Sequence, residues 1–99
     1  MRIKILASAI EDLDAGRIFY ARQGEGLGEY FFDSIFSEID SLLLCAGIHA
    51  RHFGYYRLLA KRFPYAIYYA KELDIVVIYR ILDMRRNPEI SRHALEGGI

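Results

Sequence analysis

The chain has 99 residues, of which 54% are hydrophobic and 14% are aromatic, and its 13 Lys and Arg side chains balance 13 Asp and Glu side chains. This composition excludes a disordered chain and suffices for one hydrophobic core, so we expect a single domain over residues 1–99. The net charge of zero, taken alone, argues against a nucleic-acid-binding protein.

Other protein classes are excluded by what the sequence lacks. Its single cysteine, Cys45, excludes an internal disulfide framework, and no apolar stretch reaches the ~20 residues of a membrane span. There is no phosphate-binding loop and no zinc-ligand quartet, and His49 and His52, in the predicted loop "GIHARHF", have no visible partner ligands. We therefore expect a cytoplasmic protein with no cofactor, no metal and no membrane partner.

The first elements are a short strand and a helix. Charged and apolar residues alternate over residues 2–6, which is the period of a half-buried strand. Ser8 and Glu11 have the spacing of a capping box, so we expect a helix over residues 9–23, in which Gly16 permits a close approach. The apolar residues that this helix is expected to bury are Ile10, Leu13 and Tyr20.

A second helix begins at Leu27 with a stronger pattern. Apolar residues recur there at steps of three and four positions, which predicts a helix that faces both a neighbouring helix and a sheet. These residues are Leu27, Phe31, Ile35, Ile39 and Leu42. Gly47 is a suitable terminator, and the Gly-rich break at residues 24–28 joins the two helices into an antiparallel hairpin.

The rest of the sequence predicts a sheet. Residues 55–61, 65–71 and 74–83 are rich in the β-branched and aromatic residues that strands favour, and their short links favour an antiparallel meander. Residues 87–95 are expected to form a short terminal helix with Pro88 in its first turn. The predicted fold class is α+β, with an N-terminal strand and a helical hairpin packed on a twisted, mainly antiparallel four-stranded sheet.

Charge is distributed unevenly between the two halves of the chain. Residues 1–50 contain four Lys and Arg against eight Asp and Glu, whereas residues 51–99 contain nine against five. Alternation places Arg57 and Lys61 on one face of their strand, and Arg85 and Arg86 follow the last strand directly. Cations that converge near one end of a sheet predict a binding surface for an anionic partner.

The candidate target-binding residues combine cations with an aromatic ring that could stack on a base. They are Arg62, Tyr68, Arg80 and Arg86. His93, in the predicted terminal helix, is a candidate proton donor or acceptor, because histidine titrates near neutral pH. For each of these residues, an ordinary surface or packing role is the alternative.

Nearly the whole chain resembles the RelE/ParE superfamily of bacterial toxins. The most specific segments are "FYARQGEGLG", "KRFPYAIYY" and "RRNP". The resemblance implies a helical hairpin on a twisted antiparallel sheet, as the patterns above predict independently. It also implies the toxin of a type II toxin–antitoxin system, often labelled a plasmid-stabilisation protein, which an antitoxin holds inactive in a hetero-oligomer.

The superfamily implies two activities. ParE-like members inhibit DNA gyrase, and RelE-like members are metal-independent, ribosome-dependent mRNA endoribonucleases (mRNA interferases). If the chain is RelE-like, the resemblance assigns catalytic roles to four residues, namely Arg57, Lys61, Arg85 and His93. Neutral charge, the Gly-rich hairpin and Asp83 beside the arginines favour the ParE-like branch. A third alternative is an inactive relative that only binds and assembles.

Overall fold

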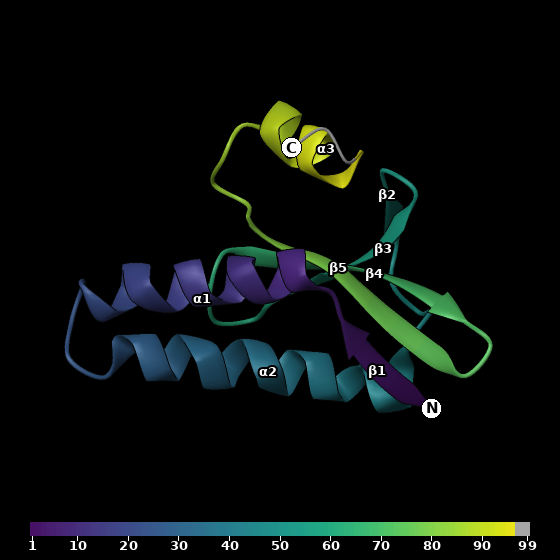
Figure 1. Ribbon diagram of the computed structural model, residues 1–99, viewed down its shortest axis with the longest axis horizontal. Helices are drawn as coiled ribbons and strands as arrows, with labels where there is room; N and C mark the ends of the chain where they lie inside the picture. The colour runs from purple at the N-terminus through teal and green to yellow at the C-terminus, as the bar shows by residue number, and fades with distance from the viewer. Residues whose placement is uncertain (97–99) are drawn as a thin grey trace.

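A computed structural model describes residues 1–96, which form two helices packed on one face of a five-stranded sheet and a short helix on the other (Figure 1). The strand order is β1-β5-β4-β3-β2, with β1 parallel to β5 and the other neighbours antiparallel. This confirms the predicted α+β fold. In chain order the elements are β1 (Arg2–Ile5), α1 (Ala7–Ala21), α2 (Leu27–Cys45), β2 (Arg51–His52), β3 (Tyr55–Leu59), β4 (Tyr65–Glu72), β5 (Ile75–Asp83) and α3 (Pro88–Leu95).

The prediction of four strands was wrong by one, because β2 lies in the segment predicted as a loop. Arg51 pairs with Tyr56 and His52 pairs with Tyr55, so β2 and β3 form a tight hairpin at the edge of the sheet. A strand of two residues is too short to show the alternation by which strands are predicted. Its existence depends on the neighbouring strand rather than on its own sequence.

The start of α1 also differs from the prediction. The helix begins at Ala7, and the Ser8 hydroxyl donates a hydrogen bond to the Tyr79 carbonyl oxygen at 3.0 Å instead of capping the helix. β1 pairs with β5 only as far as Ile78, so the backbone of β5 beyond that point has no strand neighbour on this side. Ser8 therefore satisfies an edge carbonyl of the sheet, a long-range role that a local capping pattern cannot reveal.

The face that α1 buries is narrow and consists mainly of small residues. Leu13 is buried as predicted, but Ile10 is 53% exposed, which corrects the expectation that it belongs to the core. Gly16 contacts Phe31 so closely that an added Cβ would lie 2.5 Å from the Phe31 ring. This confirms the predicted close approach, because the absence of a side chain at Gly16 makes room for a large one on α2.

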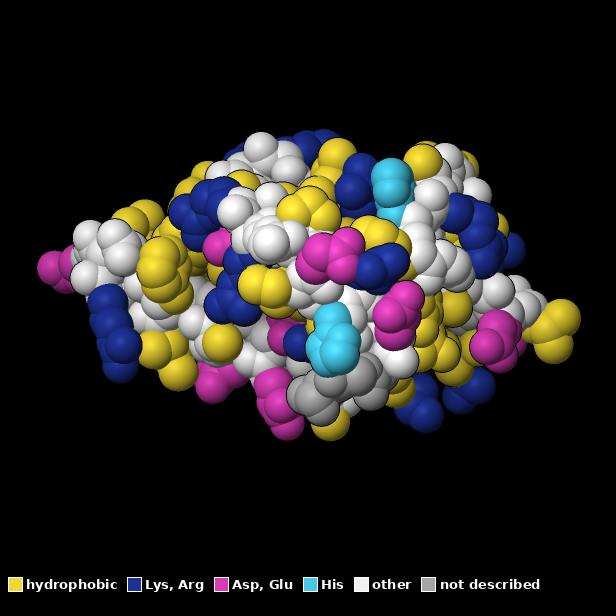
Figure 2. Space-filling model, turned by 90° about the horizontal axis from the view of Figure 1, so that it is seen from above, with side chains coloured by type: hydrophobic (Ala, Val, Ile, Leu, Met, Phe, Trp, Pro, Cys, Tyr) yellow, Lys and Arg dark blue, Asp and Glu magenta, His cyan; other side chains and the backbone are white. Residues whose placement is uncertain are grey.

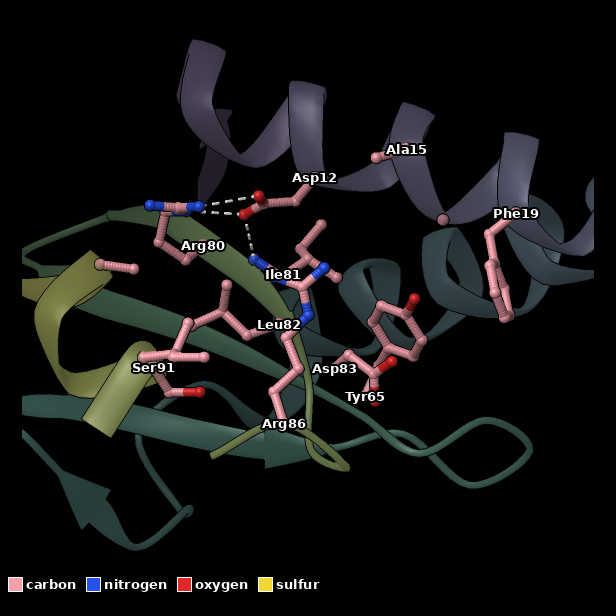
Figure 3. A pocket seen from close by; sticks show the side chains of 13 residues that line it. Asp12, Ala15, Phe19, Tyr65, Arg80, Ile81, Leu82, Asp83, Arg86 and Ser91 are labelled. Carbon is pink, nitrogen blue, oxygen red and sulfur yellow. Dashed lines mark hydrogen bonds and ion pairs between the residues drawn. The ribbon is translucent and has the colours of Figure 1, made fainter. Parts of the chain in front are cut away.

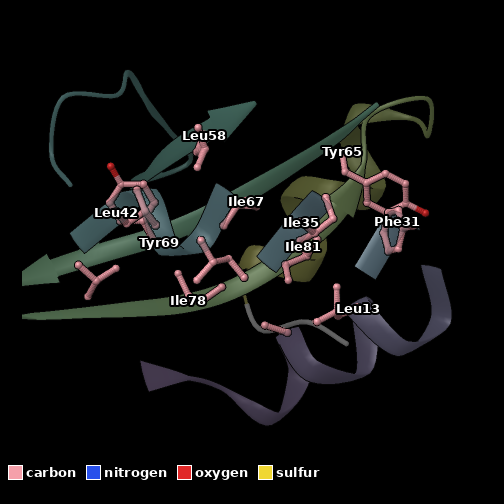
Figure 4. Close-up of a cluster of buried hydrophobic side chains, with 13 residues drawn as sticks. Leu13, Phe31, Ile35, Leu42, Leu58, Tyr65, Ile67, Tyr69, Ile78 and Ile81 are labelled. Carbon is pink, nitrogen blue, oxygen red and sulfur yellow. The ribbon is translucent and has the colours of Figure 1, made fainter. Parts of the chain in front are cut away.

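The main core lies between the helical hairpin and the sheet (Figure 4). The predicted stripe of α2 is its centre, since Phe31, Ile35, Ile39 and Leu42 are all at most 1% exposed. These side chains pack against residues of β4 and β5, which are Tyr65, Ile67, Tyr69, Val76, Ile78 and Ile81. At Gly47 the backbone has a φ of +96°, and this left-handed residue follows the end of α2 as predicted.

A β-bulge shifts the alternation of β5 in its middle. Tyr68 pairs with Arg80, whereas the next residue of β4, Tyr69, pairs with Ile78, so Tyr79 has no position of its own in the register. The residues that face the main core are therefore Val76, Ile78 and Ile81 rather than an unbroken alternate set. The bulge places Tyr79 and Arg80 together, away from that core, which strict alternation did not predict.

The short helix α3 covers part of the opposite face of the sheet. Leu95 packs there against Ala66 and Tyr68. Pro88 occupies the first turn as predicted, and the Asn87 side chain caps the helix by accepting a hydrogen bond from the Glu89 amide at 2.8 Å. Because α3 follows the end of β5 through a short connection, its position brings the residues of that connection close to the sheet (Figure 1).

A buried tyrosine links the end of α2 to the middle of the sheet. The Tyr69 hydroxyl accepts a hydrogen bond from the Gly47 amide at 2.9 Å and forms a second one with Nδ1 of His49. The donor in that second bond depends on the tautomer of neutral His49, because the hydroxyl and Nδ1 can each donate or accept. A protonated His49 would need that same hydroxyl as an acceptor.

We expect this arrangement to make the stability of the protein sensitive to mildly acidic pH. Desolvation lowers the pKa of His49 below its ordinary value of 6.5, against an opposing effect of Glu38. The unfolded chain therefore binds the proton more tightly, and stability is expected to fall as pH decreases below 6.5 toward the lowered pKa. Urea unfolding between neutral and mildly acidic pH measures this loss. His49→Asn should abolish it, whereas His52→Asn should leave it in place; equal profiles for wild type and His49→Asn would contradict the expectation.

Candidate functional site

Arg57 and Arg86 lie in one hollow on the face of the sheet that carries α3. Arg57 is on β3 and Arg86 is in the connection between β5 and α3, and the hollow between them has a volume of about 100 Å³. Its other lining residues are Phe53, Tyr68, Met84, Pro88 and Ser91. We call this the Arg57–Arg86 hollow. Within residues 1–96 neither arginine makes an ion pair, so both retain their full charge for an incoming anion.

Arg80 is not available to an anionic partner in this way. Its guanidinium donates two hydrogen bonds to the Asp12 carboxylate, from Nε at 2.7 Å and from an Nη at 2.9 Å. Both side chains are largely buried, and the hydrogen bonds to Asp12 raise the pKa of Arg80 further. Figure 3 shows the pair bridging α1 and β5. The charge of Arg80 is therefore neutralised within the fold, and target binding by Arg80 stays a prediction.

Asp12 also forms a hydrogen bond with the backbone of β5 at the edge of the sheet. The same carboxylate accepts a hydrogen bond from the Ile81 amide at 2.9 Å. Ser8 and Asp12 are four residues apart on α1, so one face of the helix supplies both an acceptor and a donor to the unpaired edge. Arg80 is therefore a structural residue that fixes α1 against the sheet.

Arg85 is held by the carboxylate that follows β5. Its Nε and an Nη donate to the two Asp83 carboxylate oxygens at 3.0 and 2.7 Å, and its backbone amide donates to the same side chain. The hydrogen bond from Arg85 lowers the pKa of Asp83, so the carboxylate stays ionised and the pair stays formed at neutral pH. Asp83 therefore forms an ion pair with Arg85, whereas Arg86 acts on Asp83 only through its charge and makes no ion pair with it.

Tyr68 does not present its ring to a partner. It is 1% exposed, because α3 covers it, whereas its neighbour Phe53 is 42% exposed. The rings of Phe53 and Tyr68 have centroids 6.3 Å apart. The alternation of β4 did not predict this burial, because both faces of that strand are covered in its middle. Target binding by Tyr68 stays a prediction.

The remaining predicted residues lie elsewhere. Strand β3 ends at Leu59, so Lys61 and Arg62 belong to the exposed loop before β4 rather than to the strand, and the Lys61 amide donates to Glu38 at 2.9 Å. His93 is on the outer surface of α3, where it lines a separate hollow with acidic and basic neighbours. The four residues assigned to catalysis are thus distributed over the hollow, the β3–β4 loop, the Asp83 pair and α3.

A second, larger hollow lies on the other side of Arg86, between α1, β5 and α3 (Figure 3). Its volume is about 220 Å³, and Arg86 points into it toward β5. Tyr65 lies in its wall, and desolvation, with a smaller effect of Asp83, raises the pKa of its hydroxyl to about 12. A phenol with that pKa stays protonated at neutral pH and is unsuited to remove a proton from a substrate.

The face that carries α3 is not uniformly basic. Figure 2 shows Lys and Arg side chains there with Asp and Glu side chains between them. The excess of Lys and Arg in residues 51–99 therefore does not make this face uniformly basic. Among residues 1–96, no cluster of three or more His, Cys, Asp and Glu side chains is placed to hold a metal ion. No helix in the same range is long and apolar enough to cross a membrane.

Sequence reasoning missed Phe53 as a member of the site. The signal was present in "RHFGYY", where Phe53 and Gly54 stand between two short β-prone segments, at the position of a two-residue hairpin turn. Recognising that turn requires recognising β2, which the sequence did not predict.

The fold has a counterpart among solved structures. No family model matches the sequence, and no curated protein matches it. The structure is similar to a chain from a solved structure described as "Chromosomal ParDE TA system from P. aeruginosa", with a TM-score of 0.73 and 23% sequence identity. The similarity covers 82% of this chain and 92% of that chain. The chain therefore has a ParE-like fold, as the resemblance in its sequence implied.

Proposed function

We propose that this chain is the growth-inhibiting toxin of a type II toxin–antitoxin pair. The observation that carries the proposal is the similarity in fold to a chain of a ParDE toxin–antitoxin system, which extends over most of both chains. The family segments noted in the sequence lie within the same fold, in the helical hairpin, in the β3–β4 region and after β5.

The proposed target is DNA gyrase, as in ParE-like toxins. What supports this choice is the state of the residues that a ribonuclease would use. Arg85 is neutralised by Asp83, and His93 lies outside the Arg57–Arg86 hollow. Cations must be free and must converge on one phosphate to stabilise its developing charge, and of the four residues assigned to catalysis only Arg57 lines the hollow.

A ribosome-dependent endoribonuclease is the second candidate, and one observation favours it. Arg57 and Arg86 line the same hollow without carboxylate partners in residues 1–96. In that reaction the ribose 2′-OH attacks the adjacent phosphorus, the bond to the 5′-oxygen breaks, and the two cations stabilise the negative charge in between. A proton must leave the 2′-OH and another must reach the 5′-oxygen, and His93 is the assigned residue for this transfer.

We propose a cognate antitoxin as the partner that keeps the chain inactive in a cytoplasmic hetero-oligomer. Two features support a protein partner with an acidic segment. Residues 51–99 carry a net positive charge, and several large apolar side chains of the helical hairpin remain exposed, among them Phe19 and Tyr30. An amphipathic acidic segment would satisfy both.

Induced expression in a bacterial host tests the proposed function. We expect growth arrest, inhibition of gyrase supercoiling by the purified chain and intact mRNA by primer extension. Cleavage within codons that depends on translation would establish the ribonuclease instead, and Arg86→Ala should then reduce it by at least ~10-fold. Arg22→Ala, which removes an exposed arginine at the far end of α1, is the matched control. Unimpeded growth would make the chain a relative that only binds and assembles.

A further inference from the structure

The three most exposed large apolar side chains among residues 1–96 lie at one end of the molecule. Leu73 is 96% exposed, Leu44 is 95% exposed and Ile48 is 76% exposed, whereas the next in order, Ile10, is 53% exposed. Leu44 is in the last turn of α2, Ile48 follows that helix, and Leu73 is in the turn between β4 and β5. Single exposed apolar residues are common on protein surfaces, but three that gather at one end indicate an interaction surface.

Contacts between the backbone segments show that these residues share one end. A Cβ on Gly47 would lie 3.4 Å from Cδ of Lys71, so the segment after α2 lies against the end of β4. The Arg2 amide donates a hydrogen bond to the Asp74 carbonyl oxygen at 2.8 Å, which places the start of β1 beside the β4–β5 turn. Figure 1 shows the end of α2, the N-terminus and this turn together, at the opposite end from the α1–α2 connection. We call this the apolar end, defined by Leu44, Ile48 and Leu73.

Leu73 has a backbone conformation that leucine rarely adopts. Its φ is +48°, and it is the first residue of the two-residue turn that joins β4 and β5. Turns of this kind favour Gly or Asn at that position, because a side chain with bulk near the backbone is strained at positive φ. Since the Leu73 side chain is almost fully exposed, burial within the chain does not offset this strain. A strained, exposed leucine indicates a role outside the folding of a single chain.

Charged residues of both signs lie in or beside the same turn. Arg2, Lys71, Glu72 and Asp74 are all exposed, and none of them makes an ion pair within residues 1–96. Two cations and two anions beside an apolar centre are complementary to the same set rotated about a twofold axis. A uniformly acidic or uniformly basic partner would instead place like charges opposite half of them. Figure 2 shows hydrophobic side chains at this end of the molecule, with side chains of both charges beside them.

We propose that two copies of this chain associate through their apolar ends, related by a twofold axis. Leu44, Ile48 and Leu73 of one copy pack against those of the other, and the cations of each copy face the anions of its partner. The surface is small, so we expect a weak dimer with a Kd in the micromolar range. None of the three apolar residues lines either hollow beside Arg86, so the contact is separate from both hollows. The proposal does not depend on the toxin function.

Leu73→Asn separates folding from association in one substitution. Asparagine is tolerated at positive φ, so the Tm in dilute solution, where the chain is monomeric, should be no lower than that of wild type. The dimer should nevertheless weaken by at least ~100-fold in sedimentation velocity, because burying one leucine contributes about 10-fold or more and the side chain is lost from both copies. Leu44→Ser should weaken the dimer by the same mechanism.

Phe53→Asn is the matched control. Phe53 has a φ of +56° in the other two-residue turn, between β2 and β3, but it lines the Arg57–Arg86 hollow instead of the apolar end. This variant removes an exposed apolar side chain from a strained turn in the same way and should dimerise like wild type. Loss of the dimer in both Asn variants would overturn the proposal.

The charges supply a second test, which does not alter the apolar residues. Lys71→Glu and Glu72→Lys each make one sign predominate beside the turn. Each variant alone should therefore dimerise at least ~10-fold more weakly than wild type at low ionic strength, whereas an equimolar mixture of the two should form a heterodimer. Only a surface that pairs with itself gives this result, and the absence of association in the mixture would contradict the proposal.

Sedimentation of wild type from low micromolar to several hundred micromolar concentration decides the remaining outcomes. The proposal is overturned if the chain stays monomeric, if Leu73→Asn dimerises like wild type, or if the oligomers keep growing with concentration, which indicates a head-to-tail contact. A monomeric wild type that co-sediments with phosphatidylcholine vesicles would also overturn it and would assign the apolar end to a lipid surface. Growth arrest on induction is measured separately, so this proposal and the toxin proposal can fail independently.

Discussion

Asp12→Ala is expected to lower the free energy of unfolding by about 3 kcal/mol, because one carboxylate serves three hydrogen bonds between α1 and β5. Its loss leaves the Arg80 guanidinium without a counter-charge in a largely buried position, and leaves the Ile81 amide without an acceptor at the sheet edge. The exposed fractions of the two side chains, 14% for Asp12 and 18% for Arg80, are small enough that water replaces these contacts poorly. Chemical denaturation with urea measures the loss.

The control for this prediction is on the same helix. Asp14 forms an ion pair with Arg17 at 2.7 Å, but both side chains are exposed, so Asp14→Ala should cost no more than about 0.5 kcal/mol. The double variant Asp12→Ala/Arg80→Met should recover about half of the loss, because the unpaired charge is removed while the Ile81 amide stays unsatisfied. Equal effects of Asp12→Ala and Asp14→Ala would show that the buried pair has no special role.

Gly28→Ala should destabilise the protein by about 2 kcal/mol, although alanine favours helices more than glycine does. A Cβ at this position in α2 would lie 2.7 Å from the Arg17 carbonyl oxygen and 2.9 Å from the Ala21 Cβ, both on α1. These are backbone and near-backbone atoms, so the two helices must move apart and the core between them must loosen. The gain in helix propensity, about 1 kcal/mol, offsets only part of this cost.

Ser37→Ala, an exposed position of the same helix, should change stability by less than about 0.5 kcal/mol. Urea unfolding of both variants and the wild type compares the two positions directly. A Gly28→Ala variant as stable as wild type would mean that the helices of the hairpin separate at little cost, and that their close contact is not required by the core.

Much of the fold could be predicted from the sequence because its periods are strong. Apolar residues of α2 recur at steps of three and four positions from Phe31 to Leu42, so the burial of this stripe follows from spacing alone. The long strands β4 and β5 and the start of α3 at Pro88 are likewise local signals. β2 has no such signal, because two residues cannot show a period, and the bulge at Tyr79 is a property of the pairing of two strands.

The candidate site was harder to predict, because a sequence shows which residues are charged but not which charges are already paired. Arg85 is paired with Asp83 two positions away, and this contact could be suspected in advance. Arg80 is paired with Asp12, 68 positions away, and no local pattern could indicate it. Only the tertiary structure therefore divides the arginines into those that hold the fold together and those that face outward.

The sequence by itself determined the helical hairpin, the three longer strands and the family resemblance, since these depend on the order of apolar and polar residues within short stretches. The tertiary structure decided that Tyr68 is covered by α3, that Asp12 neutralises Arg80, and that Phe53 joins Arg57 and Arg86 in one hollow. The physical reason is the range of the interactions involved. Periodicity reflects neighbours along the chain, whereas burial and charge pairing depend on residues that become neighbours only after the chain has folded.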